Sequence, residues 1–361
     1  MRGGDLLGNH LRWQRLSTVQ KVVVTGGAGF IGSHLVDALL AEGNEVHVVD
    51  NLATGRRDNL AHLSNEPRLS LHEIDVNDQA ALLPVMEGAK SVFHLAALAD
   101  IVPSIERPLD YARANVNGTL SVLEAARQAR VGRFLYTASS SCYGANPVYP
   151  TPETATCVPE YPYALTKYLG EQAALHWHRV YGLPVVALRL FNVYGPRARS
   201  NGSYGAMFGV FLAQKLAGKP FTVVGDGTQS RDFTFVTDVV DAFVRAAHRA
   251  GERGVAGEVF NVGTETPVAV NRIVQLLGGA SVSVPKRPGE PERTQANAHK
   301  IRTTLGWHAR TPIERGVAIL LDRINDWKAA PVWTPESISD ATRSWFACLE
   351  GNGAREGEAL L

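Results

Sequence analysis

Tyr163 and Lys167 stand four residues apart, so on a helix they lie on the same face, one turn apart. A phenol is a poor base at neutral pH because its ordinary pKa is about 10. An ammonium held one turn away favours the phenolate and lowers that pKa. The pair is therefore a candidate general base for taking a proton from a sugar or alcohol hydroxyl. Because this spacing is also common on solvent-facing helices, other features of the chain have to decide.

Three glycines, Gly26, Gly29 and Gly32, separate a β-branched run at 21–25 from an apolar-periodic helix at 34–41. A glycine fingerprint between a strand and a helix is the context of a dinucleotide site. Without Cβ atoms, the turn can be tight and its backbone can approach a pyrophosphate. The N-terminus of the following helix then favours that anion.

Asp50 ends the second expected strand, about 20 residues after the glycines. A carboxylate there can accept hydrogen bonds from both ribose hydroxyls and would repel a 2′-phosphate, which favours NAD over NADP. Arg56 and Arg57 weaken this preference slightly, since an arginine can accept that phosphate. Asp75 and Val76 follow the third strand, where they either read an adenine edge or simply form a turn.

Strands alternating with helices up to residue 190 predict an α/β fold, a Rossmann-like doubly wound parallel sheet with helices on both faces. After residue 192 the loops lengthen, which indicates a smaller C-terminal α/β lobe interleaved with the first. The expected strands are 21–25, 45–49, 69–74, 91–97, 133–137 and 185–190, and long helices are expected at 108–129 and from 162. The expected divisions are a disordered extension at 1–20, an NAD-binding domain at 21–190, a mainly substrate-binding lobe at 191–349 and a flexible tail at 350–361.

The bulk composition excludes several classes of function. Lys and Arg number 36 against 35 Asp and Glu, and no basic block stands out, so no nucleic-acid partner is expected. No apolar run approaches the roughly 20 residues that span a bilayer, and the first 20 residues lack the apolar core of a signal peptide, so no membrane association is expected. Three scattered cysteines without a CxxC pair argue against a zinc site or a disulfide framework and suit the cytoplasm.

A series of motifs, in order from residue 21 to about 330, resembles the extended short-chain dehydrogenase/reductase superfamily, specifically its NAD-dependent nucleotide-sugar epimerases and dehydratases. The motifs are Thr25 to Gly32, Asp50-Asn51, His94-Leu95-Ala96-Ala97, Ser139 to Gly144, Tyr163 with Lys167, Arg189 to Arg197, and Arg231-Asp232-Phe233 with Val236 and Asp238.

This resemblance implies NAD as the cofactor and assigns roles by position. The catalytic set would be Ser139, Tyr163 and Lys167. The cofactor would be held by Gly26, Gly29, Phe30, Ile31, Gly32, Asp50, Asn51, Gly55, Asp75, Val76, Leu95, Ala96, Ala97, Tyr163 and Lys167. The nucleotide sugar would be held by Ser139, Ser141, Asn192, Arg231, Arg287 and Glu290, with Asp100 and Ser104 as further candidates for sugar contact. Arginine suits a diphosphate because its planar fork binds oxygens in pairs.

The two positions after Ser139 help to sort the chemistry within the family. Sugar 4,6-dehydratases resemble Thr-Asp-Glu at these three positions and the decarboxylases resemble Thr-Ser-Glu, whereas this chain has Ser139-Ser140-Ser141. Lacking a carboxylate there, it is similar to the 4-epimerases of UDP-glucose and UDP-N-acetylglucosamine. The resemblance thus implies a UDP-sugar 4-epimerase working through a transient 4-keto sugar, as a homodimer formed through the helices at about 108–129 and 161–180. A 4,6-dehydratase, a 4-ketosugar reductase and a non-catalytic NAD-binding module remain as alternatives.

Overall fold

The central sheet is built from short strands whose alternate side chains pack on opposite faces. In β1 (Lys21–Thr25), Val22 and Val24 belong to one apolar cluster and Val23 to another. This is the period of two that a strand buried on both faces requires. The computed structural model describes residues 19–145, 148–198 and 207–349. Most of the extension predicted at 1–20, and all of the tail predicted at 350–361, lie outside the described residues.

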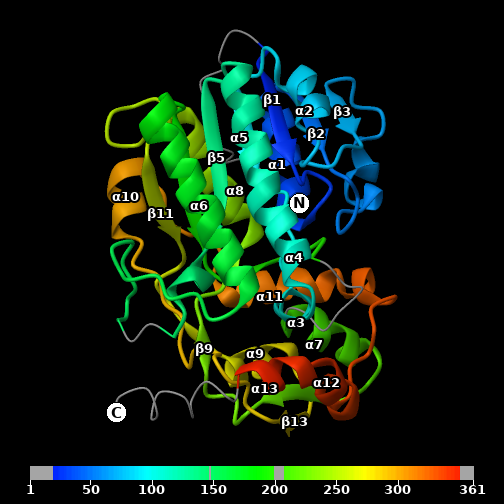
Figure 1. Ribbon diagram of the computed structural model, residues 1–361. Coiled ribbons are helices and arrows are strands. Elements are labelled where there is room, and N and C mark those ends of the chain that lie inside the picture. Colours follow the sequence, from blue (N-terminus) through cyan, green and yellow to red (C-terminus); the bar gives the residue numbers. More distant parts are fainter. Residues whose placement is uncertain (1–18, 146–147, 199–206, 350–361) are drawn as a thin grey trace, which may run out of the picture.

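Seven parallel strands form this sheet in the order β11-β6-β5-β4-β1-β2-β3. Helices α5 (Gly118–Gln128) and α6 (Pro162–Tyr181) cover one face, and α1 (Phe30–Ala41) and α8 (Val236–Arg249) pack in the apolar cluster on the other (Figure 1). The predicted doubly wound α/β fold is therefore confirmed. The strands of the sheet are β1, β2 (Glu45–Val49), β3 (Leu69–His72), β4 (Ser91–His94), β5 (Arg133–Ser139), β6 (Val185–Leu190) and β11 (Glu258–Val262).

The helices of this part include one irregular stretch. The helix predicted at 108–129 is interrupted by a π-helical turn, η2 (Ala112–Asn117), between α4 (Pro108–Tyr111) and α5 (Gly118–Gln128). The remaining helices are α1 (Phe30–Ala41), η1 (Arg57–Leu63), α2 (Gln79–Met86), α3 (Ile101–Glu106), η3 (Ser140–Tyr143), α6 (Pro162–Tyr181), α8 (Val236–Arg249) and α10 (His299–Leu305).

A second lobe lies below the carboxyl ends of the strands, around an aromatic core that includes Tyr194, Phe208, Phe211, Phe221 and Trp327 (Figure 1). The chain passes between the two lobes, because α8 and β11 follow its first strands yet pack on the central sheet. Its elements are β7 (Val193–Tyr194), α7 (Met207–Leu216), β8 (Phe221–Val224), β9 (Ser230–Arg231), β10 (Thr234–Phe235), β12 (Val268–Ala269), α9 (Val270–Leu277), β13 (Ser281–Val284), α11 (Ile313–Asp322), η4 (Ile324–Trp327), α12 (Pro335–Ala341) and α13 (Arg343–Leu349).

Candidate active site

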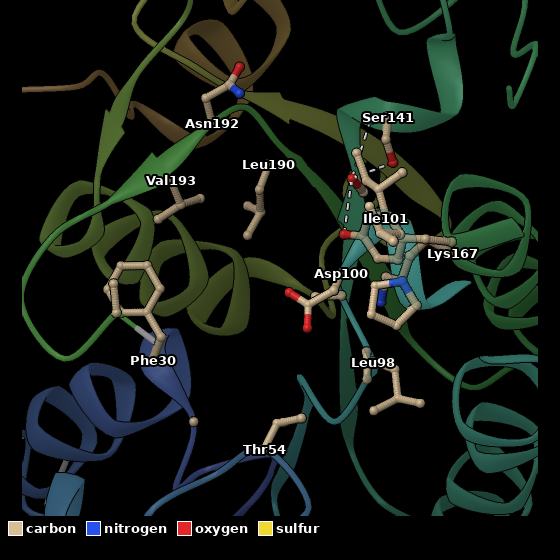
Figure 2. Close-up of a pocket in the computed structure, with 18 of the residues that line it drawn as sticks. Phe30, Thr54, Leu98, Asp100, Ile101, Ser141, Lys167, Leu190, Asn192 and Val193 are labelled. Atoms are coloured by element: carbon tan, nitrogen blue, oxygen red, sulfur yellow. Dashed lines mark hydrogen bonds between the residues drawn. The ribbon is translucent and has the colours of Figure 1, made fainter. Parts of the chain in front are cut away.

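A cavity of about 1050 Å³ runs from the carboxyl ends of the sheet strands into the second lobe. Phe30, from the start of α1, and Lys167, from α6, lie on opposite sides of it (Figure 2). The sheet order reverses at β1, between β2 and β4, and such a switch point is where ligands of open α/β sheets bind. Every residue predicted for catalysis, cofactor or substrate lines this cavity except Gly55 and Ser104.

The glycine turn is closely packed, and this explains why its residues lack side chains. Gly26 has a φ of 72°, and a Cβ on it would lie 2.6 Å from the backbone nitrogen of Ala96. A Cβ on Gly32 would overlap the carbonyl oxygen of Gly26. Helix α1 begins at this turn with no side-chain cap and no acid in its first turn. The turn thus offers an anion an uncontested helix N-terminus, which fits the pyrophosphate of a dinucleotide.

Asp50 is fixed by backbone donors at the edge of the cavity. One carboxylate oxygen accepts from the Ala28 N–H at 3.0 Å and the other from the Leu52 N–H at 2.9 Å. Burial raises the pKa of Asp50 above its ordinary value, although these two hydrogen bonds oppose that rise. Each oxygen keeps a second lone pair for a ligand hydroxyl.

Gly55 packs against Asp50 and not against the cavity. It does not line the cavity, and a Cβ on it would lie 2.7 Å from both carboxylate oxygens of Asp50, so it supports that side chain. Its contact with the cofactor stays a prediction. Arg56 donates to Asn59 at 3.1 Å and Arg57 pairs with Glu73, and neither arginine lines the cavity. The structure thus gives no support to the expectation that these two arginines weaken the preference for NAD over NADP.

Asp75 forms the turn that was one of its two interpretations, and its contact with an adenine edge stays a prediction. It lines the cavity and forms a turn, because its Oδ1 accepts from the backbone and side-chain N–H groups of Asn77 at 2.9 and 2.8 Å. Asn51, another cavity residue, donates to Oδ2 at 3.3 Å. Burial acts to raise the pKa of Asp75, but the hydrogen bonds from Asn77 and Asn51 lower it overall.

The structure brings the three candidate catalytic side chains to one wall of the cavity. Ser139 ends β5, and Tyr163 stands in the first turn of α6. The Tyr163 hydroxyl donates to Ser139 Oγ at a long 3.5 Å, and Ser139 Oγ lies 2.8 Å from Ser141 Oγ (Figure 2). The phenol therefore has a weak partner that a substrate hydroxyl can replace.

Lys167 is almost fully buried, and its ammonium lies 4.5 Å from the centre of the Tyr136 ring. Burial lowers the pKa of Lys167 to about 7, against the opposing charge of Glu171. Burial also raises the pKa of Tyr163, and only its hydrogen bond with Ser139 acts to lower it. The predicted lowering of the Tyr163 pKa by Lys167 is therefore wrong for this structure. The spacing on α6 is as expected, but the ammonium packs on a ring from β5.

This buried lysine should leave a mark on the pH dependence of stability. Its pKa is about 7 in the folded protein, well below the ordinary 10.5, so between these values the unfolded chain binds a proton that the folded chain does not. Lys167 therefore adds a term to the free energy of unfolding that rises with pH from about 7 to about 10. Urea denaturation at pH 7, 8 and 9 should show that Lys167→Met removes this rise. Parallel curves for the variant and the wild type would contradict the burial of a neutral amine.

The candidate substrate residues Arg231 and Arg287 converge on one carboxylate. Arg231 Nη2 donates to Glu290 Oε1 at 3.0 Å, and Arg287 Nη1 lies 3.7 Å from Glu290 Oε2. Asn192 lines the same cavity and accepts at Oδ1 from the Thr294 hydroxyl at 2.8 Å. Two guanidinium groups held side by side form a fork suited to a diphosphate.

The two weaker candidates for sugar contact differ. Asp100 lines the cavity, and its carboxylate points into it (Figure 2), where its charge helps burial to raise the pKa of Tyr163. Ser104 is buried outside the cavity and donates to the Ile101 carbonyl at 2.6 Å, and its sugar contact stays a prediction. With Asp100 and Glu160 in the lining, the cavity has carboxylates despite the serines at 140 and 141.

Sequence analysis missed Asn115, which joins two walls of the site. From the π-helical turn η2, its side-chain amide pairs with the backbone N–H and carbonyl of Leu98 at 2.8 and 3.0 Å. It also donates to Thr166 Oγ1 on α6 at 3.0 Å. An asparagine within a predicted helix was the available signal, because asparagine favours other conformations. Such π-turns occur frequently at functional sites.

The described part of the chain contains no helix of the length and apolarity needed to cross a bilayer. Within the same ranges, no cluster of three or more His, Cys, Asp and Glu side chains is arranged to hold a metal ion.

Comparison with known proteins identifies relatives over most of the chain. The model of the NAD dependent epimerase/dehydratase family matches residues 22–263. The chain is 37% identical to UDP-glucose 4-epimerase of Mycolicibacterium smegmatis over 82% of its own length and 96% of that protein. It is 34% identical to UDP-glucuronic acid decarboxylase 4 of Arabidopsis thaliana, covering 84% of this chain and 68% of the other. The structure of UDP-glucose 4-epimerase from Thermotoga maritima with UDP-glucose is 34% identical, with a TM-score of 0.78, over 85% of this chain and 99% of that one.

Proposed function

Because the chain belongs to the NAD dependent epimerase/dehydratase family and NAD is its cofactor, we propose that it is a nucleotide-sugar 4-epimerase. Its substrate is a UDP-hexose or UDP-N-acetylhexosamine, which turns over through a transient 4-keto sugar. The observation that carries this proposal is one cavity that holds Ser139, Tyr163 and Lys167 at one wall and the arginine pair Arg231 and Arg287 in its lining. Epimerases of UDP-glucose among the relatives support it.

The first lobe holds NAD through groups already fixed in the structure. The backbone from Gly26 to Gly32 receives the pyrophosphate, Asp50 the adenosine ribose, and Asp75 with Val76 the adenine edge. NAD bound there would supply the hydride chemistry, as acceptor for the hydride of the sugar C4 and then as its donor. Leu95 to Ala97 form a wall beside the glycine turn.

The second lobe holds the nucleotide sugar. Arg231 and Arg287 grip the diphosphate, while Glu290 keeps both guanidinium groups in place and faces the ribose of the nucleoside. Asn192 and Ser141 add neutral hydrogen-bonding groups. A grip on the diphosphate leaves the hexose free to turn, so that the 4-keto sugar can present either face without leaving.

Residues of β5 and α6 carry out the proton transfer. Tyr163 takes the proton from the 4-hydroxyl and returns it, with Ser139 bonded to the same oxygen. Since the pKa of Lys167 lies near 7, this buried amine at the same wall of the cavity can change its charge at neutral pH.

The residues at position 139 and just after it distinguish the proposed 4-epimerase from a 4,6-dehydratase. A 4,6-dehydratase needs an acid for the elimination of water, and the positions after Ser139 carry serines. Incubation with UDP-glucose and with UDP-N-acetylglucosamine separately, followed by proton NMR, should show the 4-epimer. A 4-keto-6-deoxy product would replace the proposal with a dehydratase. If the protein turns over none of a panel of UDP-, dTDP- and GDP-sugars, it is a non-catalytic NAD-binding module. If its NAD exchanges readily with free cofactor, a 4-ketosugar reductase is favoured.

Asp50→Ala should weaken NAD more than NADP, because the carboxylate accepts from the ribose hydroxyls of NAD and repels the 2′-phosphate of NADP. Losing hydrogen bonds to a charged acceptor should cost NAD on the order of 10-fold in affinity. Calorimetric titration of both cofactors into protein stripped of NAD measures the two ratios. Equal losses for NAD and NADP would count against the ribose role.

We further propose that the protein is a cytoplasmic homodimer that pairs through the face of α4 and α6. Apolar side chains are exposed there, and Leu109 is 81% exposed. The others are Leu165, Leu169, Val180 and Tyr181. Placing Glu at Leu165 and Leu169 should yield a monomer in sedimentation analysis, and a wild-type monomer would refute the pairing. Two of the three free cysteines, Cys142 and Cys157, have sulfurs 3.6 Å apart and are not bonded, which suits a reducing compartment.

A further inference from the structure

The far C-terminal helix of the described chain supplies part of the cavity. Trp345 of α13 lines it, although the family model ends at residue 263. The indole is only 4% exposed, and its Nε1 donates to the Pro288 carbonyl at 2.8 Å. The guanidinium carbon of Arg287 lies 5.5 Å from the ring centre. We propose that Trp345 positions Arg287 for the diphosphate of the nucleotide, an inference that rests on the proposed function.

Trp345 acts on Arg287 in two ways. Its hydrogen bond to Pro288 fixes the backbone directly after the arginine. Its ring faces the guanidinium, and this cation–π contact gains strength from burial, the Arg287 side chain being only 12% exposed. An arginine ordered before the ligand arrives loses little freedom on binding, which preserves affinity.

The same indole also reaches the catalytic wall. Its ring centre lies 6.4 Å from that of Tyr161, and Tyr161 stacks on Tyr163 at 6.4 Å with their planes 11° apart. Tyr161 is the residue from which α6 starts. Trp345 therefore spans the space between the diphosphate fork and the start of the catalytic helix.

Contacts with both lobes hold α13 in this place. Ser344 donates to Glu106 at the end of α3 at 2.9 Å, and α3 belongs to the first lobe. On the other side, a Cβ on Gly289 would lie 3.6 Å from Leu349 Cδ1, so the end of the helix covers the loop after Arg287. In Figure 1, α12 and α13 lie together at the foot of the second lobe. Helix α13 thus connects the two lobes beside the proposed substrate site.

A double-mutant cycle tests the inference with UDP as the probe, on protein carrying its NAD. Trp345→Ala should weaken UDP about 10-fold, as expected for a buried cation–π contact together with loss of preorganisation. Arg287→Ala should also weaken UDP, and adding Trp345→Ala to it should cost less than about 2-fold more, because the two residues act as one unit. Trp345→Phe, which keeps a ring, should recover part of the affinity.

Trp307→Phe is the matched control. Trp307 is also fully buried, and its Nε1 donates to a backbone carbonyl, that of Asp238, at 2.9 Å, but it does not line the cavity. This variant should bind UDP like the wild type. In turnover of UDP-sugar, Trp345→Ala should raise KM about 10-fold and change kcat less than about 3-fold, which general loosening of the fold would not do.

Additive losses in the cycle, or unchanged UDP affinity in Trp345→Ala, would overturn the positioning role. Wild-type protein that binds no UDP would overturn it as well. A non-additive cycle in a protein that does not epimerise UDP-sugars would keep the role of Trp345 and reject the proposed reaction, so the two failures are distinguishable.

Discussion

Tyr163→Phe should lower kcat by at least about 100-fold while NAD stays bound, because the change removes a general acid–base group and little else. The phenol oxygen carries the proposed proton transfer, and its hydrogen bond in the structure is the long one to Ser139 at 3.5 Å. The ring itself, stacked on Tyr161, is retained in phenylalanine. Turnover followed by NMR, with bound NAD read from the absorbance of the denatured protein, measures both halves of the expectation.

Tyr181→Phe serves as the control on the same helix. Tyr181 ends α6, is half exposed and does not line the cavity, so losing its hydroxyl should leave kcat unchanged. A Tyr163→Phe enzyme within about 3-fold of the wild type would reject Tyr163 as the proton-transfer group. Loss of NAD together with activity would instead assign Tyr163 to cofactor binding.

The parts of the site that could be predicted from sequence are those set by neighbours in the chain. The glycine turn is local, since Gly26 has a positive φ and Gly32 packs on the carbonyl of Gly26 itself. The six strands expected between residues 21 and 190 followed from alternation of short apolar runs with helices, whereas β11 was not among the expected strands. Tyr163 and Lys167 share a face of α6 because a helix repeats every 3.6 residues.

The parts that could not be predicted depend on packing between distant segments. Lys167 packs against the ring of Tyr136 from another element, and the burial that lowers its pKa could not be inferred from the spacing on α6. Gly55 supports Asp50 across a loop. Trp345 enters the cavity from the end of the chain, and no periodicity or motif relates it to Arg287. Such contacts are set only when segments that are distant in the chain pack together.

Glu171→Ala should lower the free energy of unfolding by about 3–5 kcal/mol, because it leaves a buried guanidinium without its counter-ion. Glu171 on α6 and Arg189 on β6 form two hydrogen bonds, at 2.7 and 2.8 Å, with side chains 1% and 5% exposed. Burial acts to lower the pKa of Arg189, and its pairing with Glu171 raises it. Because a guanidinium is not deprotonated in proteins, the arginine stays charged in the variant even without this pairing. Urea denaturation at pH 7 measures the loss.

Glu124→Ala provides the comparison, since Glu124 pairs with Arg127 at 2.6 Å on the surface of α5 and solvent screens that pair. Its unfolding curve should be hard to distinguish from that of the wild type. A loss below about 1 kcal/mol for Glu171→Ala would mean that water reaches Arg189. Glu171→Gln separates charge from packing: the charge of Glu171 raises the pKa of Lys167, so this variant should lower that pKa further below 7 and extend the rise of stability with pH to more acidic values.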